Sequence, residues 1–213
     1  MCGIVGYVGK RSAQDVLLDG LEKLEYRGYD SAGVALALDG GIRVVKSKGR
    51  LTALREKLAA QQLAQSFCGI GHTRWATHGG PSDVNSHPHM SMDGKFAVVH
   101  NGIIENYMTL KEELLVKGYQ FKSETDTEVV AHLCSDMYDG DFASTVRRVL
   151  KRLRGSYSLV FMSTYQPDTI ICCKKDNPLI VGLGDGENYI ASDIPAILNY
   201  TRRTYIMNDG EVA

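Results

Sequence analysis

The second residue of the chain is a cysteine, Cys2, which directly follows the initiator Met1. Small second residues usually permit removal of the initiator methionine, and removal leaves Cys2 with both a thiol and a free α-amino group. The amine has an ordinary pKa of about 7.7–8.0 and the thiol one of about 8.5, so a neutral amine can take the thiol proton directly or through one water. With Met1 retained, the Cys2 nitrogen is an amide and cannot act as a base. The position alone is not specific, because a small buried residue that opens a strand has the same appearance.

Three further polar clusters lie where a strand is expected to end or a helix to begin: Arg74 to His78, Asn101-Gly102 and Thr125-Asp126. An arginine offers a bidentate fork for an α-carboxylate, and an aspartate offers a counter-charge for an α-ammonium group. An asparagine side-chain N–H and a glycine backbone N–H can form an oxyanion hole for thiol attack on a carboxamide. Together with Cys2, these groups make a chemically complete set for an amino acid that carries a side-chain amide.

Each cluster also has a simpler interpretation. Arg74 is compatible with a surface ion pair, Trp75 with a core position and Asp126 with a helix N-cap. Asn101-Gly102 is a dipeptide typical of a hairpin turn. The joint occurrence of all these groups in one chain favours the functional interpretation.

The composition indicates a soluble globular protein. The chain has 213 residues, a length that fits one large domain or two small ones. Of these residues, 44% are hydrophobic and 23% are charged, which is ordinary for a soluble globular protein. The net charge of −1 and the lack of a long basic run disfavour nucleic acid and anionic membrane surfaces as partners. No apolar run approaches the ~20 residues of a membrane span, and no signal-peptide pattern is present. The 5 cysteines are irregularly spaced without a CxxC pair, which disfavours a disulfide framework or zinc ribbon and predicts a reducing cytoplasm.

Hydrophobic periodicity predicts the elements that position the polar clusters. Strands are expected at 4–8, 33–38, 42–45, 68–74 and 96–100, and five more between 157 and 207. Helices are expected from the Ser12 N-cap to Arg27-Gly28 and at 52–63, 110–116, 129–137 and 142–153. A turn is expected at Gln166-Pro167-Asp168, and a long Gly/Pro-rich loop, functional or disordered, from Trp75 to Met92. Hairpin strands with blocks of helices between them favour an α+β fold in layers.

Five motifs occur in an order that resembles one known family. They are Met1-Cys2-Gly3-Ile4-Val5-Gly6 and the segments 25–33, 72–79, 100–106 and 123–128. Together they resemble the glutaminase domain of the glutamine–fructose-6-phosphate aminotransferase (isomerizing) family, which are class II glutamine amidotransferases. The resemblance covers essentially the whole chain. The Arg-Gly-Tyr-Asp-Ser-Ala-Gly and Arg-Trp-Ala-Thr-His-Gly runs favour this family over the purine, asparagine and glutamate synthase relatives.

The resemblance implies an α+β fold of the N-terminal nucleophile hydrolase type, a four-layer αββα sandwich of two antiparallel sheets over residues 1–213. It implies hydrolysis of L-glutamine to glutamate and ammonia through a γ-glutamyl thioester, with no cofactor and no metal. The resemblance further implies that the full-length enzyme has C-terminal isomerase domains and is a homo-oligomer. In that enzyme the ammonia is expected to be transferred to fructose-6-phosphate for hexosamine synthesis. The abrupt end of the chain, at a turn followed by the start of a strand, fits a domain of a longer protein.

The resemblance also implies which residues carry the chemistry. Cys2 matches the nucleophile, and its α-amine matches the base. Asn101 and Gly102 match the oxyanion-hole positions. Arg27 matches a residue near the nucleophile that ties down the chain terminus.

For substrate binding, the resemblance assigns the glutamine carboxylate to Arg74, helped by Thr77 and His78. It assigns the glutamine ammonium to Asp126, helped by Gly102. Trp75 matches a position in a mobile loop that closes over glutamine and gates ammonia passage in the family.

Three alternatives stay open beside this interpretation. The six histidines, including His87-Pro88-His89, invite a metal site, but no carboxylate or cysteine completes a recognised zinc spacing. The glycines at 182, 184 and 186 superficially resemble a dinucleotide loop, but no helix follows in register, so a hairpin is favoured. A non-catalytic glutamine sensor with the same fold is the third alternative, and replacement of Cys2 would distinguish it from an enzyme.

Overall fold

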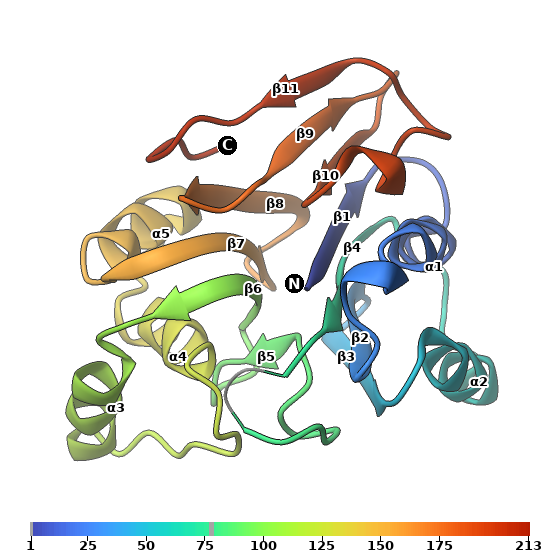
Figure 1. Cartoon of the computed structure of the whole chain (residues 1–213). Helices are drawn as coiled ribbons and strands as arrows, with labels where there is room; N and C mark the ends of the chain where they lie inside the picture. The colour runs from blue at the N-terminus through green and yellow to red at the C-terminus, as the bar shows by residue number, and fades with distance from the viewer. Residues whose placement is uncertain (1, 77–78) are drawn as a thin grey trace.

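The structure, a computed structural model, describes residues 2–76 and 79–213. It contains two β-sheets that face each other, with helices on both outer faces (Figure 1). The first sheet has seven strands in the spatial order β11 (Thr204–Ile206), β9 (Ile180–Leu183), β10 (Asn188–Ala191), β1 (Gly3–Val8), β4 (Cys68–Arg74), β2 (Ser31–Leu38) and β3 (Gly41–Lys48). The second has four, in the order β5 (His89–Met90), β6 (Phe96–Ile104), β7 (Gly155–Ser163) and β8 (Gln166–Lys175). The strand pairs within both sheets are antiparallel.

The side-chain alternation of the strands produces the layers. On β1, Ile4 packs between the two sheets, whereas its neighbour Val5 packs beneath the helices of the first sheet. On β6, Val99 faces the space between the sheets and Val98 faces the helices of the second sheet. Successive strand residues point to opposite faces, so strands buried on both sides need continuous apolar runs.

Helices α1 (Ala13–Lys23) and α2 (Leu51–Gln61) cover the first sheet. Helices α4 (Glu128–Asp136) and α5 (Phe142–Leu150) cover the second sheet, and α3 (Tyr107–Val116) packs beside α4. The arrangement is therefore the four-layer αββα sandwich that the resemblance implied. The α1 N-cap prediction is confirmed, because the Ser12 hydroxyl accepts from the Asp15 N–H.

Two local predictions were wrong. The first helix ends at Lys23, and a short 3-10 helix, η1 (Glu25–Arg27), follows it. Gly28 has an extended backbone and is no helix cap; a Cβ there would lie 2.8 Å from the Arg74 carbonyl carbon, so this glycine permits close chain contact. The segment Gln166-Pro167-Asp168 lies inside β8 rather than in a turn.

The simpler interpretation of Asn101-Gly102, a hairpin turn, does not hold either. Both residues lie inside β6, which continues to Ile104 and pairs with β7 along its whole length. By contrast, the hairpin expected at the glycines 182–186 is confirmed, since β9 and β10 pair in antiparallel fashion across it. No helix among the described residues is long and apolar enough to cross a membrane.

Candidate active site

A cavity of about 260 Å³ opens where β1 begins and β4 ends, beside β6. Figure 1 shows the start of β1 at this central place, between the two sheets. All predicted site residues that the structure describes line this cavity: Cys2, Arg27, Arg74, Trp75, Asn101, Gly102 and Asp126. Thr77 and His78, predicted to help bind the carboxylate, lie outside the described residues. Residues up to 124 positions apart in sequence thus meet because the ends of several strands converge.

Cys2 is held by the chain that follows β4. The Trp75 N–H donates to Cys2 Sγ over 3.1 Å, and Sγ lies 3.5 Å from the Trp75 carbonyl oxygen. Burial raises the pKa of the Cys2 thiol above its ordinary value, and the Trp75 N–H and the Arg74 charge offset only part of that rise. The thiol is therefore protonated at neutral pH and needs a base to become a nucleophile.

Asn101 and Gly102 reach the cavity from β6. The Asn101 side-chain N–H donates to the Cys2 carbonyl oxygen over 3.0 Å, which places the amide directly beside Cys2. Gly102 has φ +122°, and a Cβ there would lie 2.1 Å from the Ser156 carbonyl oxygen. Only glycine fits this combination of backbone conformation and close approach.

Arg74 and Asp126 supply opposite charges to the lining. Arg74 is 3% exposed and donates to the Gly79 carbonyl oxygen over 3.1 Å. Asp126 is 5% exposed, and its Oδ2 accepts from the Ile104 N–H over 2.8 Å. This contact refutes the simpler N-cap interpretation, because the capping position of α4 belongs to Thr127.

Arg27 lines the cavity, and an ion pair with Asp193 holds its guanidinium in place. Its Nη1 is 2.7 Å from Asp193 Oδ2, and the Tyr26 hydroxyl donates to the same oxygen over 2.7 Å. Burial raises the pKa of Asp193, but the hydrogen bonds from Tyr26 and Arg27 outweigh it, so the net pKa is lowered. Next to this aspartate, Ser192 exchanges hydrogen bonds of 3.0 Å with Ile4, which fixes the start of β1.

Sequence reasoning missed two residues that contact the chain segment after β4. The Asp30 carboxylate accepts from the Ala76 N–H over 2.9 Å and its own N–H donates to the Arg74 carbonyl oxygen over 3.0 Å. Tyr29 meets the Trp75 ring edge to face at 5.4 Å. Both belong to the 25–33 motif, but only the pairing of chain segments reveals that this motif supports the residues after β4.

Buried histidines form part of the cavity wall, where His87 and His100 line it, and sequence reasoning treated these residues only as possible metal ligands. His87 Nε2 and His100 Nδ1 each lie 2.9 Å from the Thr127 hydroxyl, and His89 Nε2 lies 3.1 Å from the Thr125 hydroxyl. Burial lowers the pKa of His87 and His89 well below the ordinary value. Among the described residues, no group of three or more His, Cys, Asp or Glu side chains is placed to hold a metal ion.

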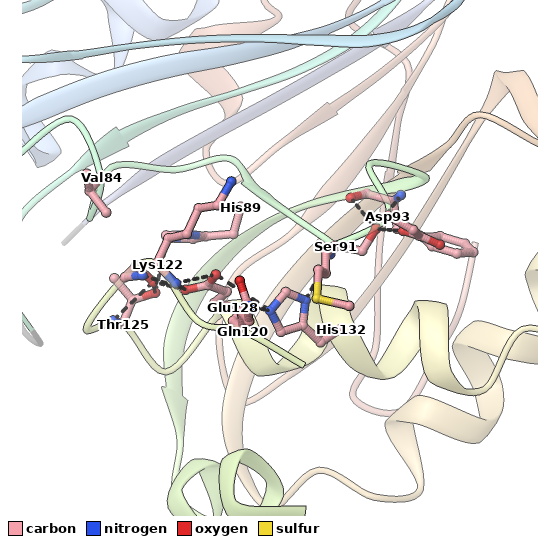
Figure 2. Close-up of polar contacts among 12 residues, drawn as sticks. Val84, His89, Ser91, Asp93, Gln120, Lys122, Thr125, Glu128 and His132 are labelled. Atoms are coloured by element: carbon pink, nitrogen blue, oxygen red, sulfur yellow. Dashed lines mark hydrogen bonds and ion pairs between the residues drawn. The ribbon is translucent and has the colours of Figure 1, made fainter. Parts of the chain in front are cut away.

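These histidines and the threonines that they contact form a polar layer, which continues away from the cavity toward α4 (Figure 2). Ser123 donates to Glu128 over 2.6 Å, and Glu128 lies 3.6 Å from His132. His132 in turn accepts from the Met92 N–H and contacts the Gln120 carbonyl oxygen. The layer therefore ties the segments before and after β5 to the start of α4.

Comparisons with known proteins agree with this architecture. Residues 72–199 match the model of the glutamine amidotransferase domain family. The chain is 58% identical over its whole length to the glutamine–fructose-6-phosphate aminotransferase [isomerizing] of Caldanaerobacter subterraneus subsp. tengcongensis, and 54% identical to that of Aquifex aeolicus. It covers 35% and 36% of those two proteins, so it spans about a third of their length.

Solved structures share the fold. The glutamine phosphoribosylpyrophosphate amidotransferase of B. subtilis superposes with a TM-score of 0.83 at 26% identity, covering 99% of this chain and 46% of that one. A structure described as the allosteric regulatory enzyme of purine biosynthesis gives a TM-score of 0.85 at 27% identity, with the same coverage. The facing sheets with a cysteine at the start of a central strand define the N-terminal nucleophile type of amidotransferase. The chain belongs to the glutamine amidotransferase domain family.

Proposed function

We propose that this chain hydrolyses L-glutamine to glutamate and ammonia through a γ-glutamyl thioester on Cys2. The observation that carries the proposal is the convergence of Cys2, the Asn101 amide, the Arg74 guanidinium and the Asp126 carboxylate on one small cavity. An α-amino acid with a side-chain amide presents the complementary groups: a carboxylate for Arg74, an ammonium for Asp126 and a carboxamide for the thiol.

The proposed reaction has two stages. The Cys2 α-amine takes the thiol proton, the sulfur attacks the carboxamide carbon, and the tetrahedral oxyanion is stabilised by Asn101 and Gly102. The C–N bond breaks as the α-ammonium returns the proton to the leaving nitrogen, which gives ammonia and the thioester. Water then cleaves the C–S bond, releases glutamate and restores the thiol. The base exists only in protein from which Met1 has been removed.

The names of the relatives extend the proposal beyond this domain. We propose that in the full-length protein the ammonia passes to C-terminal isomerase domains, that these domains use it on fructose-6-phosphate, and that the full-length protein is a cytoplasmic homo-oligomer. The support is the 54–58% identity to glutamine–fructose-6-phosphate aminotransferases, of which this chain matches about a third.

Replacement of the nucleophile tests the proposal directly. Cys2→Ala should abolish glutamate release and retain glutamine binding, because Arg74 and Asp126 remain in place. Cys68→Ala is the matched control, since Cys68 is buried and its burial raises the thiol pKa to about 12, and it should keep normal turnover. Glutaminase assays and calorimetric titration with glutamine measure both effects. Glutamine binding without any turnover in the Met1-processed, unmutated protein would instead favour the glutamine sensor.

A further inference from the structure

His72 contacts the side chain of Asn101 and has no role in the proposed mechanism. It is on β4, opposite Ile4 of β1, and its side chain is fully buried. Its Nε2 is 3.0 Å from Asn101 Oδ1 and 3.1 Å from the His100 carbonyl oxygen. The ring stacks on His87 with 4.2 Å between the ring centroids and an angle of 26° between the planes. His72 therefore joins the strand that ends at the cavity to the strand that carries the Asn101 amide.

The contacts determine which nitrogen of His72 carries the proton. The His100 carbonyl oxygen can only accept, so Nε2 must be the donor. The other nitrogen, Nδ1, is buried and has no hydrogen-bond partner among the described residues. A protonated ring would need an acceptor at Nδ1, and the pKa of His72 is lowered to about 3, mainly by burial. The ring is thus neutral with its proton on Nε2 and is no general base.

The orientation of the Asn101 amide follows from both of its ends. Its Nδ2 faces the Cys2 carbonyl oxygen, which only accepts, and its Oδ1 faces the His72 N–H, which only donates. A rotation of the amide by half a turn would place oxygen against oxygen and nitrogen against a donor. An amide nitrogen carries two N–H groups, so one serves the Cys2 carbonyl oxygen and the second is left for the cavity that Asn101 lines.

We propose that His72 is a positioning residue that holds the Asn101 amide with its N–H groups, rather than its oxygen, toward the nucleophile. The inference rests on the proposed glutaminase function, in which Asn101 stabilises the oxyanion. Without the His72 donor, Asn101 Oδ1 loses its buried partner, and the amide is free to turn its oxygen toward the developing negative charge. The strand neighbour Gly33 supports the arrangement, because a Cβ there would lie 2.2 Å from the His87 carbonyl oxygen and would displace the ring that stacks on His72.

The test compares five variants of the Met1-processed protein in a glutaminase assay. His72→Leu should lower kcat about 10- to 100-fold with KM changed less than about threefold, because the oxyanion forms only after substrate has bound. His72→Gln, which can place an amide N–H near the lost Nε2, should recover most of that loss. In an Asn101→Ala background, His72→Leu should cost no more than about a further twofold, because its effect acts through Asn101.

His132→Gln is the matched control, since His132 is also a buried histidine but contacts only the α4 side of the polar layer, and it should retain kcat. A loss for His132→Gln equal to that for His72→Leu, or fully additive losses in the double variant, would overturn the positioning role. So would an unchanged kcat in His72→Leu.

A second measurement does not depend on turnover or on the folding of the Leu variant. Nitrogen-15 NMR of the histidine-labelled, unmutated protein should show His72 as the Nε2–H tautomer, with shifts that stay constant from pH 8 to pH 5. A proton on Nδ1, or titration near pH 6.5, would overturn the inference even if glutamine is hydrolysed. An unmutated protein that fails to turn over glutamine but shows this tautomer refutes the glutaminase proposal and leaves the His72–Asn101 contact established.

Discussion

Arg74 is buried, although most arginines lie at the surface. Its guanidinium lines the cavity beside Cys2 and is anchored by the Gly79 carbonyl oxygen. Burial lowers its pKa, whereas Cys2, Asp30 and Asp126 act in the opposite direction, so the arginine remains a cation in the site. A buried cation at a cavity is suited to an anionic part of a ligand, which the proposed function identifies as the glutamine α-carboxylate.

Arg74→Lys tests this assignment because it keeps the charge and removes the planar fork. We expect KM for glutamine to rise about 10- to 100-fold, from the loss of one of two parallel charge-assisted hydrogen bonds, with a smaller effect on kcat. Arg55→Lys is the control, since Arg55 lies in a partly exposed ion pair with Glu22 remote from the cavity lining, and should leave KM unchanged. An Arg74→Lys enzyme with normal KM would remove Arg74 from carboxylate binding.

Residue types predicted which side chains converge on the cavity, but not the residues that support them. Cys2, Asn101 and Asp126 were found because their chemistry is carried by the side chain itself. His72 and Asp30 act by contacting other residues, His72 on Asn101 and Asp30 on the chain after Arg74. Such contacts depend on which strands become neighbours, and a single sequence does not reveal that.

Among the elements, β6 has the most direct influence on the site because it carries both proposed oxyanion donors. Its pairing with β7 runs without interruption from Phe96 to Ile104, so the backbone at Gly102 is set by the whole strand pair. The dipeptide Asn-Gly suggested a turn because its local preference is strong. Here the pairing of a nine-residue strand outweighs that preference.

Gly102→Ala should disrupt this element. The added Cβ would meet the Ser156 carbonyl oxygen at 2.1 Å at a φ of +122°, so we expect a loss of more than about 4 kcal/mol in the free energy of unfolding, together with loss of turnover. Gly94→Ala is the control: Gly94 has φ +71° but nothing within 4 Å of the added Cβ, so it should lose only about 1–2 kcal/mol. Urea unfolding of both variants measures the difference, and equal losses would contradict the steric argument.

The order and type of the elements were largely predictable, because the central strands are continuous apolar runs and helices such as α1 and α5 carry their apolar residues at helical spacing. The residues at which the elements begin and end were less predictable. Gly28 resembled a helix cap, but its role is to let η1 approach the chain at Arg74, a contact between distant segments. The turn between β7 and β8 was misplaced by two residues because Pro167 suggested a turn although it lies in an exposed part of β8.

In the molecule as a whole, burial of neutral histidines makes stability depend on pH. The pKa of His72 is lowered to about 3, and those of His87 and His89 are lowered well below the ordinary value, all mainly by burial. Below pH 6.5 the unfolded chain therefore binds protons at these positions and the folded chain does not. Their contribution is fully present above about pH 7 and is lost progressively as the pH falls.

We expect these three histidines to reduce the free energy of unfolding by about 1.4 kcal/mol each between pH 7.5 and pH 5.5, or about 4 kcal/mol together. Urea unfolding at a series of pH values measures the loss, and His89→Gln should reduce it by about a third. A free energy of unfolding that does not change over this range, or that rises as the pH falls, would contradict the assignment of three neutral buried rings.

Covalent labelling tests the central claim most directly. Protein whose intact mass shows removal of Met1 is incubated with an electrophilic glutamine analogue, and the modified residue is mapped by peptide mass spectrometry. Modification at Cys2 alone, with protection by glutamine, is the result we predict, because Cys2 is the cysteine that lines the cavity. Modification at Cys68, Cys134, Cys172 or Cys173 in place of Cys2 would contradict the account.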